Sequence, residues 1–194
     1  MNLNNLRDQI HANAAVKGFW DNNPSDQHFL MLVITELSEA VEADRKGRRA
    51  DIQDYKLLSK ASIERTGNQD YFNEVSFCYH IKDSVEDELA DAFIRLLDLF
   101  GAREVYLNED VFDLKTIEEY AATYQGKSFT ESVYHIVRFI SATSRSIETS
   151  AVTPEIMLLE ILGFAKHLDI DLMWHVEQKI KYNQSRGRMH GKKY

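Results

Sequence analysis

The sequence contains almost no cysteine and almost no proline. One cysteine, Cys78, occurs in 194 residues, which excludes an internal disulfide and a metal site built from several cysteines. A lone cysteine also fits a reducing compartment, and we expect the protein in the cytoplasm. The two prolines, Pro24 and Pro154, leave nearly the whole chain free to form long helices, because proline is the residue that interrupts helices most strongly.

Long hydrophobic runs are missing as well. No apolar stretch approaches the roughly 18 residues that span a bilayer. The N-terminal segment MNLNNLRDQIHANAAVKGFW lacks the apolar core of a signal peptide. We therefore expect a soluble protein with no membrane partner. Its length suits a single domain, residues 1–194, with a hydrophobic core of its own.

Negative charge dominates the chain except at its C-terminal end. The formal net charge is −8, yet the segment 179–194, KIKYNQSRGRMHGKKY, contains no acid. Its cations are Lys179, Lys181, Arg186, Arg188, Lys192 and Lys193. A basic tail on an acidic body indicates either that the tail contacts nucleic acid or that it contributes cations to a functional site in the rest of the protein. We favour the second and expect no nucleic-acid partner, because the acidic body would repel a phosphate backbone.

Strong apolar stripes predict two helices in the first half of the chain. Residues 25–46 repeat apolar positions at helical spacing before the basic stretch RKGRR. Residues 83–100 do the same, with Asp83 as the predicted N-cap, Glu86 three residues later and Gly101 as the stop. The polar segment between them, 48–82, is interpreted as an insertion with a short helix over 52–63.

Three more helices are predicted after a polar connection. The segments SFTESVYHIVRFISATSRSIE (128–148) and TPEIMLLEILGFAKHLDID (153–171) both have helical periodicity, and the second begins with Thr153 as its cap and Pro154 in its first turn. A last helix over 171–183 leads into the basic tail. No segment alternates as a strand would, so we predict an all-α helical bundle.

Acidic side chains lie beside the first two stripes. Glu36 and Glu39 are three residues apart on the first predicted helix, and Glu88 and Asp91 are three residues apart on the second. Positions i and i+3 share a helix face, so each helix places a carboxylate pair next to its apolar seam. Either pair alone is ordinary for a solvated helix surface. The other acids on these helices that we expect to be solvated are Glu42, Asp44 and Asp98.

Two such pairs can converge only if positive charge neutralises them, because clustered carboxylates repel one another and lose hydration. A hard divalent cation would do so, and all-oxygen ligation favours magnesium, manganese or calcium. A di-iron carboxylate bundle is the competing metal interpretation. It characteristically uses an ExxH element from each of two helices, and the sequence contains no ExxH.

The combination of motifs is more specific than each motif alone. ExxE on one helix, ExxD with Ala90 inside it on the next, and the basic tail together resemble the MazG-like all-α nucleoside triphosphate pyrophosphohydrolase superfamily. The resemblance covers GFWDNNPSDQHFLMLVITELSEAVEADRKGR, the ExxD helix and the tail. It implies a four-helix-bundle-like MazG-type fold, with an inserted segment between the first two core helices that is longer than the usual connection in the family.

The resemblance also implies an activity and its residues. Members of the family cleave a (deoxy)nucleoside triphosphate to the monophosphate and pyrophosphate with Mg²⁺, for which Mn²⁺ can substitute, as housecleaning of the nucleotide pool. The matching magnesium ligands are Glu36, Glu39, Glu88 and Asp91. The phosphate contacts are Lys179, Asn183 and Arg186, with Lys192 in the HGKK segment as a further cation over the phosphates. We assign Glu39 as the general base.

The nucleobase has two predicted contacts. Trp20, just ahead of the first helix, could stack on the base, and Gln27 or Asn23 could hydrogen-bond to its edge. The alternative for Trp20 is packing, because an aromatic residue next to a helix start is often a hydrophobic staple.

Residues 130–170 are predicted to form a second helix pair that resembles the first without its acids. SATSR stands where ExxE would be and EILG where ExxD would be. Such a pair would complete a four-helix core as a pseudo-dimer within one chain, where simpler relatives form homo-oligomers. Two rival functions stay open: a non-catalytic bundle that binds a partner through its charged faces, and a related hydrolase that acts on a modified or alarmone-like nucleotide.

Overall fold

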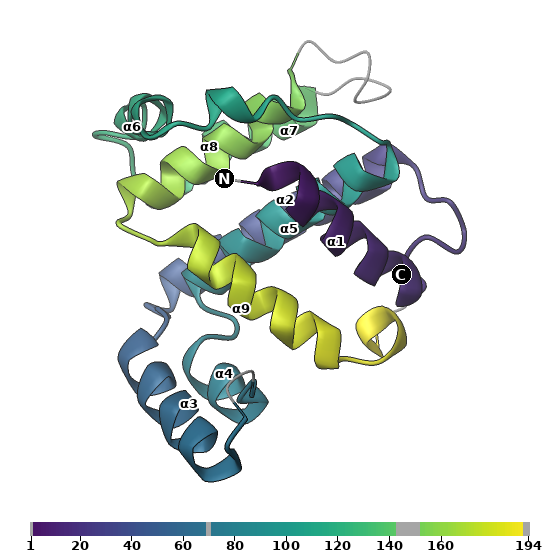
Figure 1. Cartoon of the computed structure of the whole chain (residues 1–194). Coiled ribbons are helices and arrows are strands. Elements are labelled where there is room, and N and C mark those ends of the chain that lie inside the picture. Colours follow the sequence, from purple (N-terminus) through teal and green to yellow (C-terminus); the bar gives the residue numbers. More distant parts are fainter. Residues whose placement is uncertain (1, 69–70, 143–151, 192–194) are drawn as a thin grey trace.

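The structure is a computed structural model that describes residues 2–68, 71–142 and 152–191. Every regular element within these ranges is a helix, which confirms the all-α prediction (Figure 1). The α-helices are α1 (Leu3–Val16), α2 (Asp26–Arg45), α3 (Ile52–Thr66), α4 (Glu74–His80), α5 (Val85–Ala102), α6 (Leu114–Ala122), α7 (Phe129–Ala142), α8 (Pro154–His167) and α9 (Leu172–Ser185). Short 3-10 helices are η1 (Glu109–Val111) and η3 (Arg188–Gly191). None of the helices in the described ranges has the length and apolar character needed to cross a membrane.

Helices α2 and α5 form an antiparallel pair at the centre of the molecule. Ser25 caps α2 and Ser84 caps α5, each accepting the backbone N–H three residues later. The prediction of Asp83 as the cap of α5 is wrong by one residue, since Asp83 precedes the cap with φ +60°. The Val85 N–H donates to the Arg48 carbonyl at 3.2 Å. Helix α5 therefore begins where α2 ends, and their middle turns face each other.

Helix α1, which was not predicted, packs along α5. A Cβ at Gly101 would lie 2.5 Å from the Cβ of His11, so only glycine permits this close approach. Helix α5 continues through Gly101 to Ala102, and the predicted stop at Gly101 is therefore wrong. The glycine serves the packing of two helices rather than the end of one.

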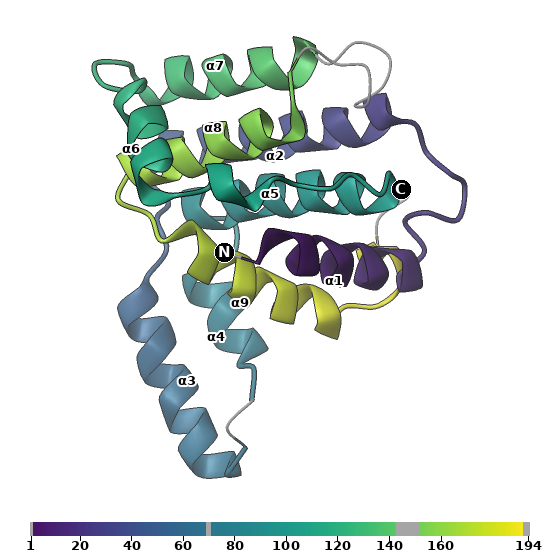
Figure 2. The same ribbon diagram turned by 45° about the horizontal axis from the view of Figure 1, so that its top comes forward.

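Helices α7 and α8 pack against the central pair. Helix α7 contacts α2, α8 contacts α5, and the two contact each other; Figure 2 shows these four helices running side by side. Thr153 caps α8 with Pro154 in its first turn, as predicted. The end of the third predicted helical segment, residues 143–148, lies outside the described ranges. The connection expected to be merely polar contains α6, which packs on α8 at Gly163.

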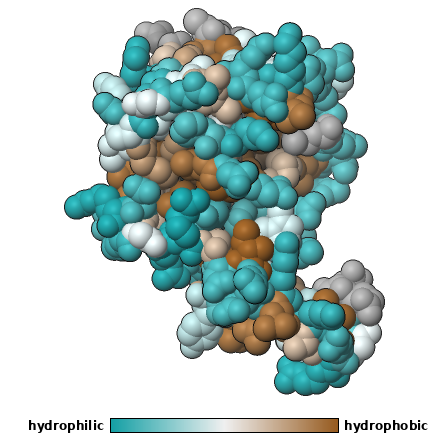
Figure 3. Space-filling view, turned by 90° about the vertical axis from the view of Figure 1, so that its left-hand side faces the viewer, coloured by the Kyte–Doolittle hydropathy of each residue, from teal (hydrophilic) through white to brown (hydrophobic). Residues whose placement is uncertain are grey.

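The segment between α2 and α5 forms a helical hairpin, α3 and α4, which projects from the bundle and which we call the arm (Figures 1 and 3). It has a small core of its own, made by Tyr55, Phe77 and Ile81 together with Tyr182 of α9. The predicted helix near 52–63 is confirmed as α3, although it extends to Thr66, and α4 was not predicted.

Helix α9 lies along α5 and contacts the arm through α4. Beyond it, the chain turns back to the C-terminal end of α1. The Met189 N–H donates to the Lys17 carbonyl at 2.8 Å, and Arg188 pairs with Asp21 at 2.5 Å. The basic segment, as far as Gly191, is thereby held next to α5 and α9, where the predicted site residues lie.

Candidate metal and phosphate site

Three carboxylates meet between α2 and α5. One oxygen of each of Glu36, Glu88 and Asp91 lies within 4.8 Å of the other two. Glu36 is 3% exposed and Glu88 is 5% exposed, so the group sits in the seam between the helices rather than on their surface. Glu88 and Asp91 are one turn apart on α5, and Glu36 faces them from the middle of α2. The structure thus brings together three of the four predicted ligands.

The fourth predicted ligand, Glu39, lies outside this group. Its side chain is exposed on α2, one turn beyond Glu36. Burial raises the pKa of Glu36, and the negative charges of Asp91 and, to a smaller extent, Glu39 raise it further. Glu39 therefore borders the site electrostatically, on its solvent side.

Two cations lie against the carboxylates. The Lys179 Nζ of α9 lies 2.7 Å from the Asp87 Oδ2 and 2.8 Å from the Asp91 Oδ2. The Arg95 Nε lies 2.5 Å from the Glu36 Oε1. Burial lowers the pKa of Lys179, but the two aspartates more than reverse that shift, so the pKa is raised and the ammonium is charged. Lys179, predicted as a phosphate contact, is instead paired with the carboxylates of α5.

The charges of the site do not balance. Glu36, Asp87, Glu88 and Asp91 carry four negative charges when ionised, and Lys179 with Arg95 supplies two positive ones. The Asp87 Oδ1 is buried and has no hydrogen-bond partner in the described part of the chain. Burial, with the charges of Asp91 and Asp87, raises the pKa of Glu88 to about 9, so this carboxyl holds a proton at neutral pH.

One divalent cation would restore the balance. The donors are carboxylate oxygens, which suit Mg²⁺, Mn²⁺ or Ca²⁺, and the group already converges at ligand-like separation. A second group, Asp83, Asp87 and Glu88, shares Glu88 with the first. The residues present therefore fit a hard divalent cation, with Glu88 at the centre of the acidic cluster.

A pocket opens beside the carboxylates. The cavity has a volume of about 80 Å³ and is open to solvent at its mouth. Its apolar lining is Ile10, Ala14, Phe19, Phe29, Ile94 and Ile180. Its polar lining includes Asp91, Arg95, Asn183, Arg186 and His190. Asp91 and Arg95 thus belong to both the carboxylate site and the pocket.

The predicted phosphate contacts are only partly in the pocket. Asn183 and Arg186 line it, and the Arg186 guanidinium donates to the His190 carbonyl at 2.9 Å while lying over the ring of Tyr182. Lys192 lies outside the described residues. Two of the polar groups expected to bind phosphate therefore face the same space as Asp91.

The predicted base contacts lie elsewhere. Trp20 stacks on Phe29 at 4.0 Å between ring centroids and donates its Nε1–H to the Asp98 Oδ1 at 2.9 Å. Gln27 is exposed at the start of α2, and neither residue is part of the pocket lining. Asp98, expected to be solvated, is buried and also pairs with His11, so that expectation is wrong. Phe19 and Phe29 are the rings that reach the pocket.

Sequence reasoning missed Asp87 and Arg95. Both were recognisable, because Asp87, Asp91 and Arg95 follow one another at four-residue spacing on α5 and so lie on one face of the helix. Their partners, Lys179 and Glu36, come from distant parts of the chain, which spacing alone does not reveal.

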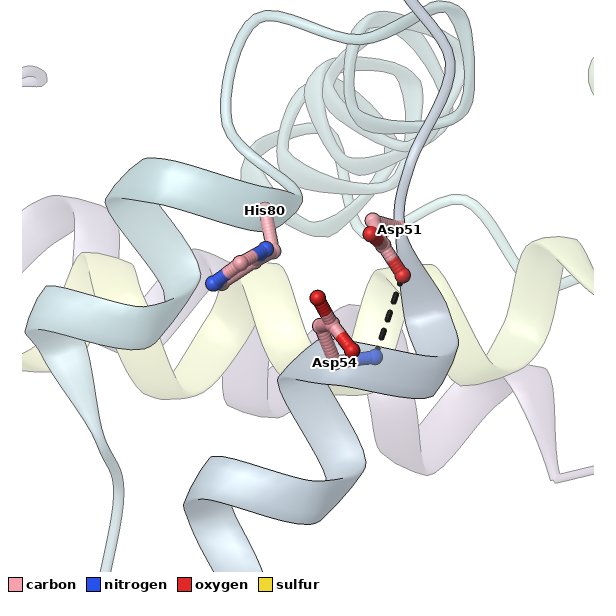
Figure 4. Close-up of side chains that lie close together, drawn as sticks. All are labelled: Asp51, Asp54 and His80. Carbon is pink, nitrogen blue, oxygen red and sulfur yellow. Dashed lines mark hydrogen bonds between the residues drawn. The ribbon is translucent and has the colours of Figure 1, made fainter.

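A further group of potential ligands lies at the base of the arm, formed by Asp51, Asp54 and His80 (Figure 4). Asp51 caps α3, and its carboxylate accepts the Asp54 N–H at 3.0 Å. Both aspartates are exposed, and they lie at a helix N-terminus, where the helix dipole already stabilises negative charge. Helix capping accounts for this group without a cation.

Comparison with family models, curated proteins and solved structures finds no match to this chain.

Proposed function

We propose that the protein is a magnesium-dependent nucleoside triphosphate pyrophosphohydrolase. The observation that carries the proposal is that Asp91 and Arg95 belong both to the buried carboxylate site and to the adjoining pocket. A cation held by Glu36, Glu88 and Asp91 would therefore lie at the edge of this pocket. The resemblance of the ExxE and ExxD motifs and the basic tail to the MazG-like superfamily supports the same function.

The cation and the protein side chains would contribute different parts of the reaction. Magnesium, when bound, would neutralise phosphate charge and lower the pKa of a bound water. Asn183 and Arg186 would bind phosphoryl oxygens from the opposite side of the pocket, as polar and cationic side chains do in phosphate sites. Glu39, exposed beside Glu36, would accept a proton from the attacking water.

The apolar part of the pocket supports binding of the nucleoside. Phe19 and Phe29 offer ring faces or edges, and Ile94 and Ile180 form apolar walls. A nucleobase gains from such surroundings through stacking and burial. Trp20 supports this arrangement indirectly, because it stacks on Phe29 and is not itself part of the pocket lining.

Lys179 would have two roles in turn. In the protein alone, its ammonium neutralises Asp87 and Asp91. Since a divalent cation at Asp91 would take over part of that role, the ammonium would then stabilise negative charge on the phosphates or on departing pyrophosphate.

The test is pyrophosphate release from a panel of ordinary and modified nucleoside triphosphates, with magnesium and with chelator. We expect magnesium-dependent release, and a fall of roughly 100-fold or more in Glu88→Gln, the size of loss seen when one charge-stabilising group is removed. Glu42→Gln is the matched control, since Glu42 lies exposed on α2 and pairs with its neighbours Arg45 and Lys46.

Two outcomes would contradict the proposal. Absence of release from every triphosphate would favour the non-catalytic bundle. Equal activity of Glu88→Gln and Glu42→Gln would show that the buried carboxylates do not serve the reaction. Release from modified triphosphates alone would support the proposed hydrolysis and restrict the substrates to modified nucleotides.

A further inference from the structure

A second hollow lies on the other side of α9, between that helix and the arm. It encloses about 1130 Å³ of space outside protein atoms, open solvent included. Four aromatic residues line it: Tyr55, Tyr71, Phe72 and Trp174. We call it the aromatic groove. Figure 3 shows the arm standing off the body, so this space is bounded on two sides by separate helical units.

The rings of the groove are held in place by specific contacts. The Tyr55 hydroxyl donates to the Gln178 Oε1 at 2.9 Å, and the Tyr55 and Trp174 rings meet edge to face at 5.7 Å between centroids. Tyr55 is 4% exposed, so its contact supports the Trp174 ring from the protein interior. Trp174 and Phe72 are partly exposed and Tyr71 is exposed, so these three rings remain accessible to a ligand.

The groove is positively charged within an acidic protein. Lys56, Lys60 and Lys181 line it, and Glu64 is the acid among its lining residues. The Lys56 Nζ lies 5.2 Å from the centre of the Trp174 ring. The chain as a whole carries a formal charge of −8, so this local excess of lysines is not a consequence of composition. Accessible rings next to ammonium groups suit a ligand with a flat aromatic part and an anionic part.

We propose that the aromatic groove binds a nucleoside phosphate, with the base against Trp174 and its neighbouring rings and the phosphate toward Lys60 and Lys181. Both parts of the ligand are needed, because the rings offer nothing to inorganic phosphate and the lysines offer nothing to a neutral base. A single-stranded nucleic acid has the same chemistry. It fits less well, because its phosphates beyond the groove would meet the acidic body.

This groove is separate from the carboxylate site. Trp174, Gln178 and Lys181 follow helical spacing along one face of α9, whereas Lys179 and Asn183 lie on the opposite face. The two linings have no residue in common. The inference therefore does not depend on the proposed hydrolysis, and either can fail without the other.

The experiment uses tryptophan fluorescence in the presence of chelator. The chain has two tryptophans, so Trp20→Phe leaves Trp174 as the reporter. Adenosine monophosphate is the probe, and inorganic phosphate, adenosine and a single-stranded oligoadenylate are the comparisons. We expect the monophosphate to quench Trp174 in a saturable way and to bind more tightly than either of its parts.

Charge variants locate the binding. In the Trp20→Phe background, Lys60→Gln with Lys181→Gln should weaken binding of the monophosphate about tenfold, corresponding to about 1.4 kcal/mol. Lys115→Gln is the control, because Lys115 is exposed on α6 and pairs with Glu119 at 3.7 Å, away from the groove. Equal melting temperatures of the variants establish that folding is intact.

The inference is overturned if the monophosphate leaves Trp174 fluorescence unchanged, if inorganic phosphate binds as tightly as the nucleotide, or if the double lysine variant binds like the control. Binding of the oligoadenylate without binding of the monophosphate would also overturn it, in favour of a nucleic-acid surface.

Discussion

The two helix pairs of the bundle bury acidic residues in opposite ways. In the pair α7 and α8, Glu160 is 3% exposed. The Tyr124 hydroxyl donates to its Oε2 at 2.5 Å, and the His135 Nε2 lies 3.5 Å from the same oxygen. In the pair α2 and α5, Glu88 is buried almost as deeply, at 5% exposed, but its nearest charged neighbours include Asp87 and Asp91, which repel it.

The burial of a carboxylate therefore does not by itself distinguish a functional-site residue from a structural residue of the core. A buried carboxylate with a donor is a structural hydrogen bond. A buried carboxylate among others of the same sign stores unfavourable energy that a cation or a proton must relieve. Glu160 belongs to the first kind and Glu88 to the second, although both occupy the inner face of a core helix.

The largest expected effect on stability comes from removing the cation that holds the acidic pair together. Lys179→Met should destabilise the metal-free protein by about 3–5 kcal/mol, because Asp87 and Asp91 would lose a buried partner. Urea unfolding in chelator measures this. Lys181→Met, an exposed neighbour on the same helix, should change stability little. Equal stability of the two variants would mean that Lys179 does not neutralise the cluster.

A smaller loss is expected in the second pair. Tyr124→Phe removes the hydroxyl that donates to Glu160 and should cost about 1–3 kcal/mol, the usual penalty for leaving a buried polar group unsatisfied. Pyrophosphate release per folded molecule should stay the same, since this hydrogen bond is not part of the carboxylate site. Tyr134→Phe, at an exposed position of α7, is the control. A loss of activity in Tyr124→Phe without loss of stability would contradict the structural role given to Glu160.

The fold was largely predictable where helices have strong apolar stripes. Helices α2, α5, α7, α8 and α9 were predicted from their apolar periodicity, because each supplies several residues to the core. The capping residue was predicted correctly for α8. Helix α1 was missed because it has only two buried residues, Leu3 and Ile10, and so no strong apolar stripe. Its stability as a helix comes from packing against α5. Helix α6 has no fully buried residue and was missed for the same reason.

The acidic residues of the site could be predicted from the sequence, but the ion pairs that they form could not. Spacing on α5 placed Glu88 and Asp91 on one face, and their meeting with Glu36 followed from the antiparallel arrangement of α2 and α5. The role of Lys179 did not follow, because its partner Asp87 is 92 residues away in the chain. Trp20 was open to two interpretations, and its bond to Asp98, 78 residues distant, favours the packing role.

The response to magnesium should separate the acidic pair from the rest of the bundle. A ligand that binds the folded state alone adds about 1.4 kcal/mol to the free energy of unfolding at ten times its dissociation constant. We expect this gain in the wild type and a much smaller one in Asp91→Asn and Glu36→Gln, which each remove one oxygen ligand. Glu42→Gln should gain as much as the wild type. Calorimetry with magnesium and with chelator provides the comparison, and a full response in Asp91→Asn would exclude it as a ligand.

A further expected effect is a slope in the pH dependence of stability. The pKa of Glu88 is about 9 in the folded protein, against an ordinary value of 4.5. Between these values the folded state holds a proton that the unfolded state has released, so the free energy of unfolding of the metal-free protein falls as pH rises. The slope is at most about 1.4 kcal/mol per pH unit, and it ends above pH 9.

The window from pH 7 to 9 separates Glu88 from two other buried groups. Burial raises the pKa of Asp87 to about 6 and lowers that of His175 to about 4 from 6.5, so both titrate mainly below pH 7. In this window, Glu88→Gln in chelator should lose less stability per pH unit than Glu42→Gln, because the amide has no proton to release. Chemical unfolding at several pH values gives both slopes. Parallel slopes for the two variants would mean that Glu88 is already ionised in the folded protein, and the site would then resemble the satisfied carboxylate of the second helix pair.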